Sequence, residues 1–211
     1  NSKFFKLQNI KNLKKKEKKK VLIDLKKITF KRKNFLKNIN FLHPVIMGIL
    51  NLTPDSFSDG GKFNSKTKSL LQIKKMIQSG AKIIDVGGES TRPGSNTVDP
   101  NIEWKRIQHV LKNFKKKYNK TCLSIDTRKS IVMIKSLKYG ADIINDVSGF
   151  KYDKNSLSVL KKYNISKVLH HMQGTPKNMQ KKPKYKNVLL DIYDFFEKNI
   201  NQIDNKKKIL L

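Results

Sequence analysis

Cysteine is almost absent from this chain of 211 residues, because Cys122 is the only one. A single thiol cannot form an internal disulfide bond, which excludes the class of small secreted domains held together by disulfides. Long apolar runs are also missing, and a membrane-spanning helix needs about 18 or more. The N-terminus has no uninterrupted apolar stretch of the kind found in secretory signals. We therefore expect a cytoplasmic protein with no membrane partner.

Acidic residues are scarce, with 16 Asp and Glu against 47 Lys and Arg and a formal net charge of +31. Such an excess is typical of nucleic-acid-binding proteins. Only four of the basic residues are arginine, however, and the lysines are spread over nearly every segment. Arginine forks are what base-reading proteins use most. Alanine is rarer still, with only two residues, and a strongly AT-rich genome imposes such a composition. We expect a lysine-rich solvated surface without a nucleic-acid partner, and a basic nucleic-acid-binding protein is the alternative.

The first 20 residues end in a lysine block and are expected to form a disordered extension, because like charges repel one another. The loosely alternating apolar residues of 21–41 predict a short hairpin. We therefore expect one domain over residues 21–211.

From Val45 onward, short apolar runs alternate with longer stretches of helical spacing, which predicts a parallel sheet covered by helices. Gly80 and Gly140 stand where helices would end in a left-handed glycine cap. The apolar runs are VIMGILN (45–51), IIDVGG (83–88), TCLSID (121–126), IINDVS (143–148), SKVLHHM (166–172) and KILL (208–211).

Two architectures fit this alternation: an open doubly wound sheet and a TIM (β/α)8 barrel. Five of the runs end in polar residues, including Asn51, Asp126 and Asn145. In a barrel all these ends surround one mouth, whereas an open sheet concentrates its chemistry at one switch point. The pattern favours a TIM barrel, incomplete in this chain, with about five βα units and the start of a sixth strand.

Two loops are unusually rich in glycine and polar residues. MGILNLTPDSFSDGG (47–61) leads from an apolar strand into a long turn-forming loop. DVGGESTRPGS (85–95) contains Arg92, whose planar fork of donors suits a diphosphate or a carboxylate. We expect the two loops to form a lid over the barrel mouth.

With these two loops in view, residues 43–211 resemble the dihydropteroate synthases, the pterin-binding barrel enzymes of folate synthesis. Three further motifs, SIDTRK (124–129), IINDVSG (143–149) and HMQGTPKNMQ (171–180), follow in the order and spacing of the family. Pterin-binding methyltransferases share the barrel, but the TPDSF and STRPG segments of the two loops favour the synthase.

The resemblance implies a reaction in which 4-aminobenzoate displaces diphosphate from 6-hydroxymethyl-7,8-dihydropterin diphosphate, giving dihydropteroate. Diphosphate leaves first, assisted by Mg2+, and the amine captures the resulting cation. The protein therefore has to bind the substrates, neutralise the leaving group and exclude water.

The resemblance also assigns roles to individual residues. Asn51 matches the Mg2+ ligand, a hard oxygen donor. Asp126 and Asn145 match residues that hydrogen-bond the pterin ring, and the charge of Asp126 would stabilise the developing cation. The diphosphate would be held by Thr91 and Arg92. Of the site residues, we take Asp126 and Arg92 as catalytic.

For the 4-aminobenzoate site, the matching residues are Phe57, Ser90 and Pro93. The chain's four histidines lack the spacing of a metal site, although His171 could support the pterin pocket. Asp85 and Asp146 are interpreted as hydrogen-bonded framework residues.

The family sequence continues with an Asp-Pro-Gly motif, a lysine motif and an Arg-x-His motif, whereas this chain ends at Leu211. We therefore expect little or no synthase activity from the 211 residues alone, and the family's homodimer is in doubt for them. An inactive remnant of the enzyme is the alternative to a fragment of a working one.

Overall fold

The computed structural model describes residues 7–29, 35–53, 66–92, 94–163, 165–175, 177–180, 182–203 and 209–210. Its contacts divide the chain into two units, Asn1–Phe35 and Leu36–Leu211. The boundary thus falls later than the expected one after residue 20. Among the described residues, no helix is both long and apolar enough to cross a membrane.

The first unit is helical where we expected disorder and then a hairpin. It contains a 3-10 helix, η1 (Leu7–Asn12), and the helix α1 (Lys15–Thr29). Lysine and leucine are good helix formers, and Glu17 accepts a hydrogen bond from the backbone N–H of Lys14 at the start of α1 (3.2 Å). These local preferences outweigh the repulsion between lysines, so the disorder prediction was wrong for residues 15–20.

A short hairpin does form, but it is confined to the end of the expected segment. Strand β1 (Phe35–Leu36) pairs with β2 (Ile39–Asn40) in a two-stranded sheet. Lys37 in the turn between them has a positive φ of 53°.

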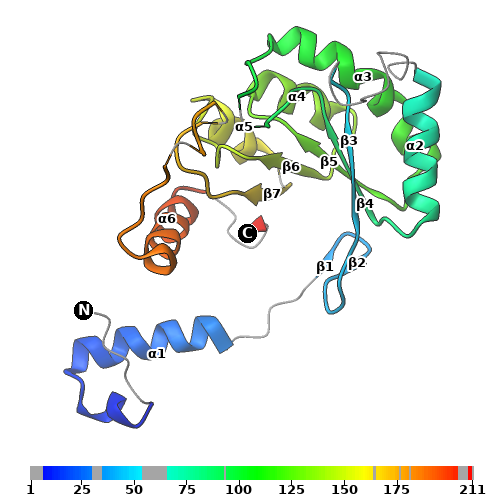
Figure 1. Ribbon diagram of the computed structural model, residues 1–211. Helices are drawn as coiled ribbons and strands as arrows, with labels where there is room; N and C mark the ends of the chain where they lie inside the picture. Colours follow the sequence, from blue (N-terminus) through cyan, green and yellow to red (C-terminus); the bar gives the residue numbers. More distant parts are fainter. Residues whose placement is uncertain are drawn as a thin grey trace. The chain divides into compact units, whose positions relative to one another are not determined.

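The second unit is built on a six-stranded parallel sheet whose strands follow one another in chain order (Figure 1). The strands are β3 (Met47–Asn51), β4 (Ile83–Gly87), β5 (Cys122–Asp126), β6 (Ile143–Asp146), β7 (Ser166–Leu169) and β8 (Ile209–Leu210). The helices between them are α2 (Lys66–Gln78), α3 (Pro100–Lys117), α4 (Ser130–Lys138), α5 (Ser156–Lys162) and α6 (Val188–Gln202). A doubly wound sheet reverses its strand order at a switch point, and the described strands do not. The prediction of five βα units and a sixth strand of a TIM barrel is confirmed.

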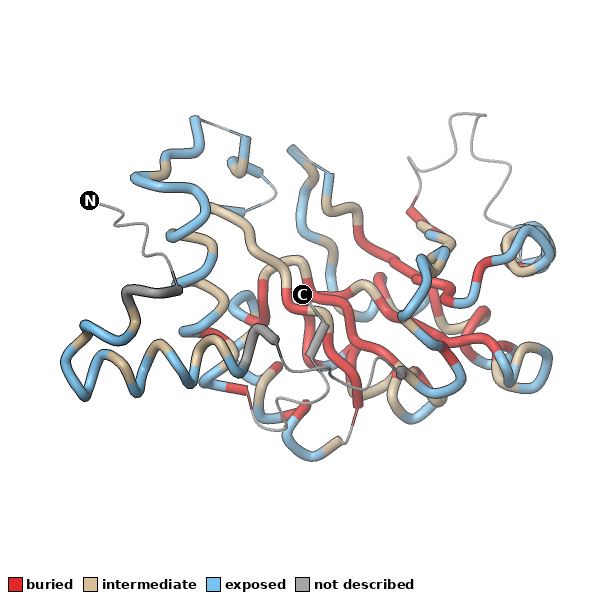
Figure 2. Tube along the Cα trace, turned by 90° about the horizontal axis from the view of Figure 1, so that it is seen from below, coloured by how far each residue is buried: buried red, intermediate tan, exposed pale blue. Residues whose placement is uncertain are grey.

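Alternate residues of the strands face two separate apolar clusters. On the helix side, Leu50, Ile84 and Leu123 pack among residues of α2 to α6. On the opposite side, Ile83 and Cys122 pack with Ile39 of the hairpin. Figure 2 shows the buried residues concentrated along these strands, while α1 carries only exposed and half-buried ones over 15–26.

The predicted glycine caps are present. Gly80 after α2 has φ +102°, and Gly140 after α4 has φ +83°. Both values lie in the left-handed region that glycine adopts without strain. Each cap turns the chain directly into the next buried strand and so fixes where β4 and β6 begin.

Candidate active site

Three of the predicted site residues lie in one row across the carboxyl ends of four neighbouring strands. Asn51 of β3 pairs in register with Gly87 of β4, Gly87 with Asp126 of β5, and Asp126 with Asn145 of β6. Residues in register on parallel strands point to the same side of the sheet. The strand-end row, defined as Asn51, Gly87, Asp126 and Asn145, therefore presents its side chains to one space.

Gly87 leaves room in the middle of this row. A Cβ atom at position 87 would lie 3.2 Å from Oδ1 of Asn51 and 3.6 Å from Oδ2 of Asp126. An amide oxygen and a carboxylate oxygen thus converge above a residue without a side chain. Such an arrangement offers two oxygen ligands and space for a group between them.

Asp126 has an incompletely satisfied carboxyl group. Its Oδ1 is enclosed and has no hydrogen-bond partner among the described residues. Burial, and after it the negative charges of Asp85 and Asp146, hold the pKa of Asp126 well above its ordinary value. A buried acceptor without a partner costs free energy, so a ligand carrying N–H donors would be stabilised here.

Asn145 is buried and its amide is held from both sides. Its Nδ2 donates to Oδ2 of Asp85 (3.0 Å), and its Oδ1 lies 2.7 Å from Nε2 of His170. Burial raises the pKa of Asp85 and lowers that of His170. Asp85 therefore acts as a hydrogen-bonding framework residue, as the sequence indicated.

His170 belongs to this site, but sequence reasoning did not find it. The sequence pattern favours His171 instead, because it opens a family motif. In the structure the ring of His171 makes an edge contact with Phe195 of α6 (4.7 Å between centroids) and lies 5.9 Å from the ring of Tyr185. No described contact joins His171 to the strand-end row. The available signal was that His170 directly follows the last residue of β7.

The second loop forms a tight turn around its hydroxyl groups. Ser95 Oγ donates to the backbone oxygen of Ser90 (2.6 Å), and the N–H of Ser95 donates to the oxygen of Arg92 (3.1 Å). Arg92 is exposed and Thr91 half-buried. No described contact joins Thr91 or Arg92 to the strand-end row, so their assignment as diphosphate ligands stays a prediction.

Two further predictions, Phe57 and Pro93, lie outside the described residues. Residues 54–61 of the first loop also lie outside them. Its proposed lid function is therefore a sequence-based prediction.

A buried charge network fixes the second loop to the end of β5, and sequence reasoning missed it. Glu89 accepts hydrogen bonds from Arg128 (2.8 and 3.1 Å), Lys129 (2.7 Å) and the backbone N–H of Val98 (2.8 Å). Lys129 also donates to Glu103 of α3 (2.6 Å). We call Glu89, Glu103, Arg128 and Lys129 the loop anchor.

The pKa values of the two acids in the loop anchor shift in opposite directions. Burial alone would raise the pKa of Glu89, but the hydrogen bonds from Lys129, Val98 and Arg128 outweigh it and lower the pKa. For Glu103, burial outweighs the bond from Lys129 and raises the pKa. The anchor thus favours the ionised form of Glu89 between the two cations. These ion pairs hold the second loop against the segment after β5.

The donor set at the row fits a hard divalent cation. Mg2+ prefers oxygen ligands, keeps several waters and takes few ligands from the protein. Asn51 Oδ1 beside Asp126 Oδ2 supplies such oxygens. Within the described ranges there is no group of three or more His, Cys, Asp or Glu side chains that could hold a metal by themselves. Such a cation would take its remaining ligands from water or from a bound anion.

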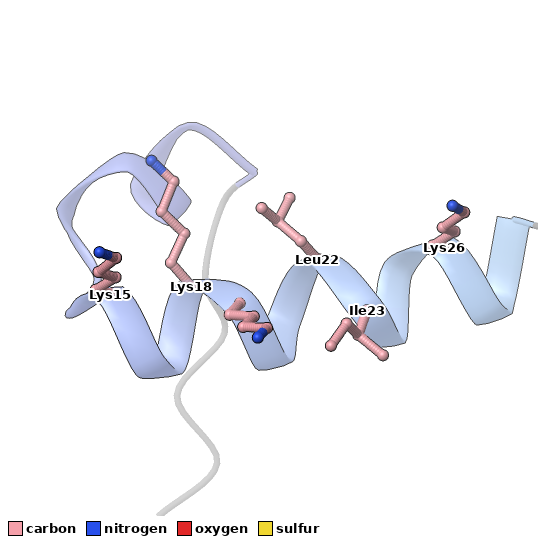
Figure 3. Close-up of a pocket in the computed structure, with 6 residues that line it drawn as sticks. Lys15, Lys18, Leu22, Ile23 and Lys26 are labelled. Atoms are coloured by element: carbon pink, nitrogen blue, oxygen red, sulfur yellow. The ribbon is translucent and has the colours of Figure 1, made fainter.

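One hollow surface belongs to the first unit. Figure 3 shows Lys15, Lys18, Leu22, Ile23 and Lys26 projecting from α1 around it, and Lys19 also lines it. Its volume is about 350 Å³. Four lysines and two apolar residues line it, without a carboxylate or a histidine beside them.

Comparison with known proteins identifies the family. The model of the pterin binding enzymes matches residues 47–210. The dihydropteroate synthase of Haemophilus influenzae is 42% identical over 159 residues, which are 75% of this chain and 57% of that protein.

Solved structures agree with this match. The Yersinia pestis dihydropteroate synthase, in a sulfonamide drug complex, has a TM-score of 0.76 and 39% identity, with 82% of this chain and 63% of that one covered. The Burkholderia cenocepacia enzyme, complexed with 7,8-dihydropteroate, has a TM-score of 0.69 and 32% identity, covering 81% and 58%. The chain spans about three fifths of the length of the first curated relatives it matches. With its strands in barrel order and polar residues at their carboxyl ends, the chain belongs to the pterin-binding enzyme family.

Proposed function

We propose that this chain carries the pterin site of a dihydropteroate synthase. The reaction joins 6-hydroxymethyl-7,8-dihydropterin diphosphate to 4-aminobenzoate and gives dihydropteroate and diphosphate. The observation that carries the proposal is the strand-end row, in which Asn51, Asp126 and Asn145 face one space around Gly87. Relatives named dihydropteroate synthase, and the dihydropteroate bound to the Burkholderia enzyme, support it.

The pterin ring is bound by Asp126 and Asn145. A pterin carries neighbouring N–H donors and ring acceptors, and the unpartnered Oδ1 of Asp126 needs a donor. Donation from the ring would stabilise the ionised form of Asp126 and offset the cost of its burial. Asn145 offers one further amide hydrogen and one further lone pair beyond those used by Asp85 and His170.

The bond between the pterin methylene carbon and the diphosphate oxygen breaks, and the electron pair leaves with diphosphate. The negative charge of Asp126 stabilises the cation that develops on the pterin. The amine of 4-aminobenzoate then forms the new carbon–nitrogen bond and releases one proton. No side chain has to act as a nucleophile, so the protein's contribution is binding, orientation and exclusion of water.

Diphosphate is held by Thr91 and Arg92 from the second loop in this proposal. The Arg92 guanidinium is exposed and can form paired hydrogen bonds with phosphate oxygens. Asn51 and the diphosphate itself would hold a Mg2+ ion, which supplies charge neutralisation to the leaving group. Ser90, with Phe57 and Pro93, would line the 4-aminobenzoate site.

Pterin binding is the first property to measure, because the strand-end row binds the substrate rather than performing covalent chemistry. Titration with 6-hydroxymethyl-7,8-dihydropterin diphosphate and Mg2+, followed by calorimetry, should give saturable binding. Asp126→Ala and Asn145→Ala should weaken it at least about tenfold, the effect of losing one or two hydrogen bonds. A wild-type chain that binds no pterin would refute the proposal.

Turnover separates an enzyme from an inactive remnant that still binds pterin. Addition of 4-aminobenzoate, with dihydropteroate detected by chromatography, measures turnover, and Arg92→Ala should lower any rate that is observed. Binding without product formation would support the remnant. The dimer implied by the family is a separate proposal, which analytical ultracentrifugation of the wild-type chain tests.

A further inference from the structure

Three side chains form a continuous hydrogen-bonded series beside the strand-end row. Asn145 lies in the centre, between Oδ2 of Asp85 at 3.0 Å and Nε2 of His170 at 2.7 Å. Asp85 is on β4 and Asn145 on β6, while His170 directly follows β7. The series therefore joins three separate strands at the carboxyl end of the sheet.

The contacts indicate the direction of these hydrogen bonds. Nδ2 of Asn145 donates to Oδ2 of Asp85 (3.0 Å), and a carboxylate oxygen accepts this hydrogen. That orientation directs Oδ1 of Asn145 toward His170. An amide oxygen also only accepts, so Nε2 of His170 must carry the hydrogen. The imidazole is then in its Nε2–H form when neutral, and burial favours the neutral form by lowering the pKa of His170.

Without His170, the amide of Asn145 would be less firmly oriented. The last torsion of asparagine has a broad, roughly two-fold preference, and a half-turn exchanges the oxygen and the nitrogen. The bond to Asp85 opposes this exchange from one side, and the bond from His170 opposes it from the other. Asn145 stands in register with Asp126, so the groups left free on its amide face the same space as the carboxylate.

We propose that His170 is a positioning residue for the pterin site: by donating from Nε2 to Oδ1, it holds the Asn145 amide with a defined donor and acceptor toward the heterocycle. This inference rests on the proposed function, since it names the residue that prepares Asn145 for its ligand. His170 itself does not have to touch the pterin. Its effect falls on substrate affinity, because the orientation is set before the substrate arrives.

The first test needs no substrate. Nitrogen–proton correlation spectra of the histidine rings, recorded on the ligand-free protein, should show the Nε2–H form for His170. The signal is assigned by its loss in His170→Gln. An Nδ1–H form would mean that the series runs in the opposite direction, with Nδ2 of Asn145 donating to the ring, and would overturn the proposal.

The second test compares two substitutions of one residue. His170→Leu removes the donor and should weaken pterin diphosphate binding about tenfold, the effect of one hydrogen bond. His170→Gln keeps an N–H donor at a similar reach and should restore most of the affinity. In a turnover assay the loss should appear in KM more than in kcat. His43→Leu, at an exposed histidine, is the matched control and should bind as the wild type does.

The outcomes separate this inference from the proposed function. Equal affinity of the wild type and His170→Leu, with both proteins folded by circular dichroism, would overturn the positioning role while leaving pterin binding intact. Failure of the wild type to bind pterin would refute the function, and with it the role in preparing Asn145. If His170→Leu does not fold, the tautomer in the wild type and the affinity of His170→Gln decide the question.

Discussion

The amide oxygen of Asn51 and the carboxylate of Asp126 lie on two sides of Gly87, within 3.2 and 3.6 Å of the position that a Cβ atom would take there. Gly87→Ala would place a methyl group between them. We expect affinity for pterin diphosphate with Mg2+ to fall at least about tenfold. The melting temperature should change little, because the nearest atom belongs to a side chain that can move.

Gly88→Ala is the control for Gly87→Ala. It should lower the folding stability, which Gly87→Ala should leave almost unchanged. A Cβ at position 88 would lie 2.7 Å from the backbone oxygen of Glu103 and 3.0 Å from Cγ2 of Ile107. Helix α3 would have to shift, and overpacking of this kind costs about 1–3 kcal/mol of folding stability. Urea denaturation measures this loss. Equal loss of stability in the two variants would contradict the view that Gly87 is kept for ligand space.

Metal removal should affect the wild type and leave Asn51→Ala unchanged. Asn51 contributes a neutral oxygen at the end of β3, and the other ligands of Mg2+ would come from diphosphate and water. Chelation with EDTA should weaken diphosphate binding to the wild type about tenfold. Asn51→Ala should bind weakly with or without Mg2+, and Asn113→Ala, at an exposed asparagine of α3, should behave as the wild type. Full Mg2+ dependence in Asn51→Ala would argue against Asn51 as the ligand.

Asp126→Asn should stabilise the ligand-free fold and weaken pterin binding. The carboxyl has an enclosed oxygen without a described partner, and burial with nearby acids raises its pKa. An amide removes the cost of ionising this group. Thermal unfolding should therefore show an equal or higher melting temperature, while calorimetry should show weaker binding. Asp194→Asn, at an exposed acid of α6, should change neither quantity, and lower stability of Asp126→Asn would count against the argument.

Lys129→Met should be strongly destabilising. Lys129 is 4% exposed and forms ion pairs with both Glu89 and Glu103. Removal of one partner from a buried ion pair costs about 3–5 kcal/mol, because the other charge stays buried. The double variant Lys129→Met/Glu103→Gln should recover part of the loss. Lys138→Met, at an exposed lysine of α4, is the control for denaturation, and a loss below about 1 kcal/mol would contradict the network.

The stability difference between Asp146→Asn and the wild type should depend on pH. Burial raises the pKa of Asp146 from 3.8 to about 6. The folded state therefore binds this proton more tightly than the unfolded state. The resulting stabilisation is fully present below pH 4 and is lost as the pH rises through 6. Asp146→Asn should gain about 2–3 kcal/mol relative to the wild type between pH 4 and 8.

Asp153→Asn is the control for this pH series, because the pKa of Asp153 is shifted in the opposite direction from that of Asp146. Partial burial would raise the pKa of Asp153, but hydrogen bonds from Ser130 and Asn155 outweigh it and lower the pKa. Its stabilising effect is present above its unfolded pKa and is lost on acidification. The variant should therefore be less stable than the wild type at neutral pH. A pH-independent difference for Asp146→Asn would contradict the assignment.

The barrel and half of the site could be predicted because they depend on short-range patterns. Apolar runs ending in Asn51, Asp126 and Asn145 locate the carboxyl ends of strands, and parallel strands in chain order bring such ends together. The family motifs pointed to the same residues. Helix α1 does not follow from charge alone, because the helix propensity of its lysines opposes their mutual repulsion.

The remaining contacts join residues far apart in the sequence. His170 meets Asn145 across 25 positions, and Lys129 meets Glu89 across 40. No local sequence pattern predicts such a pair. A histidine after a strand, or a lysine after an aspartate-containing turn, is equally compatible with a solvent-exposed position. Strand register and helix packing select the partner, and neither can be read from composition or spacing.

The loop anchor has a consequence for anyone who would transplant the second loop into another barrel. Glu89 lies in that loop. The two cations of the loop anchor come from the segment after β5, and its second acid comes from α3. A graft of residues 85–95 alone would bring in the buried carboxylate of Glu89 and leave both cations behind. The second loop and the loop anchor therefore form one structural unit. We expect exchange of this loop between related barrels to succeed only when Glu103, Arg128 and Lys129 are transferred with it.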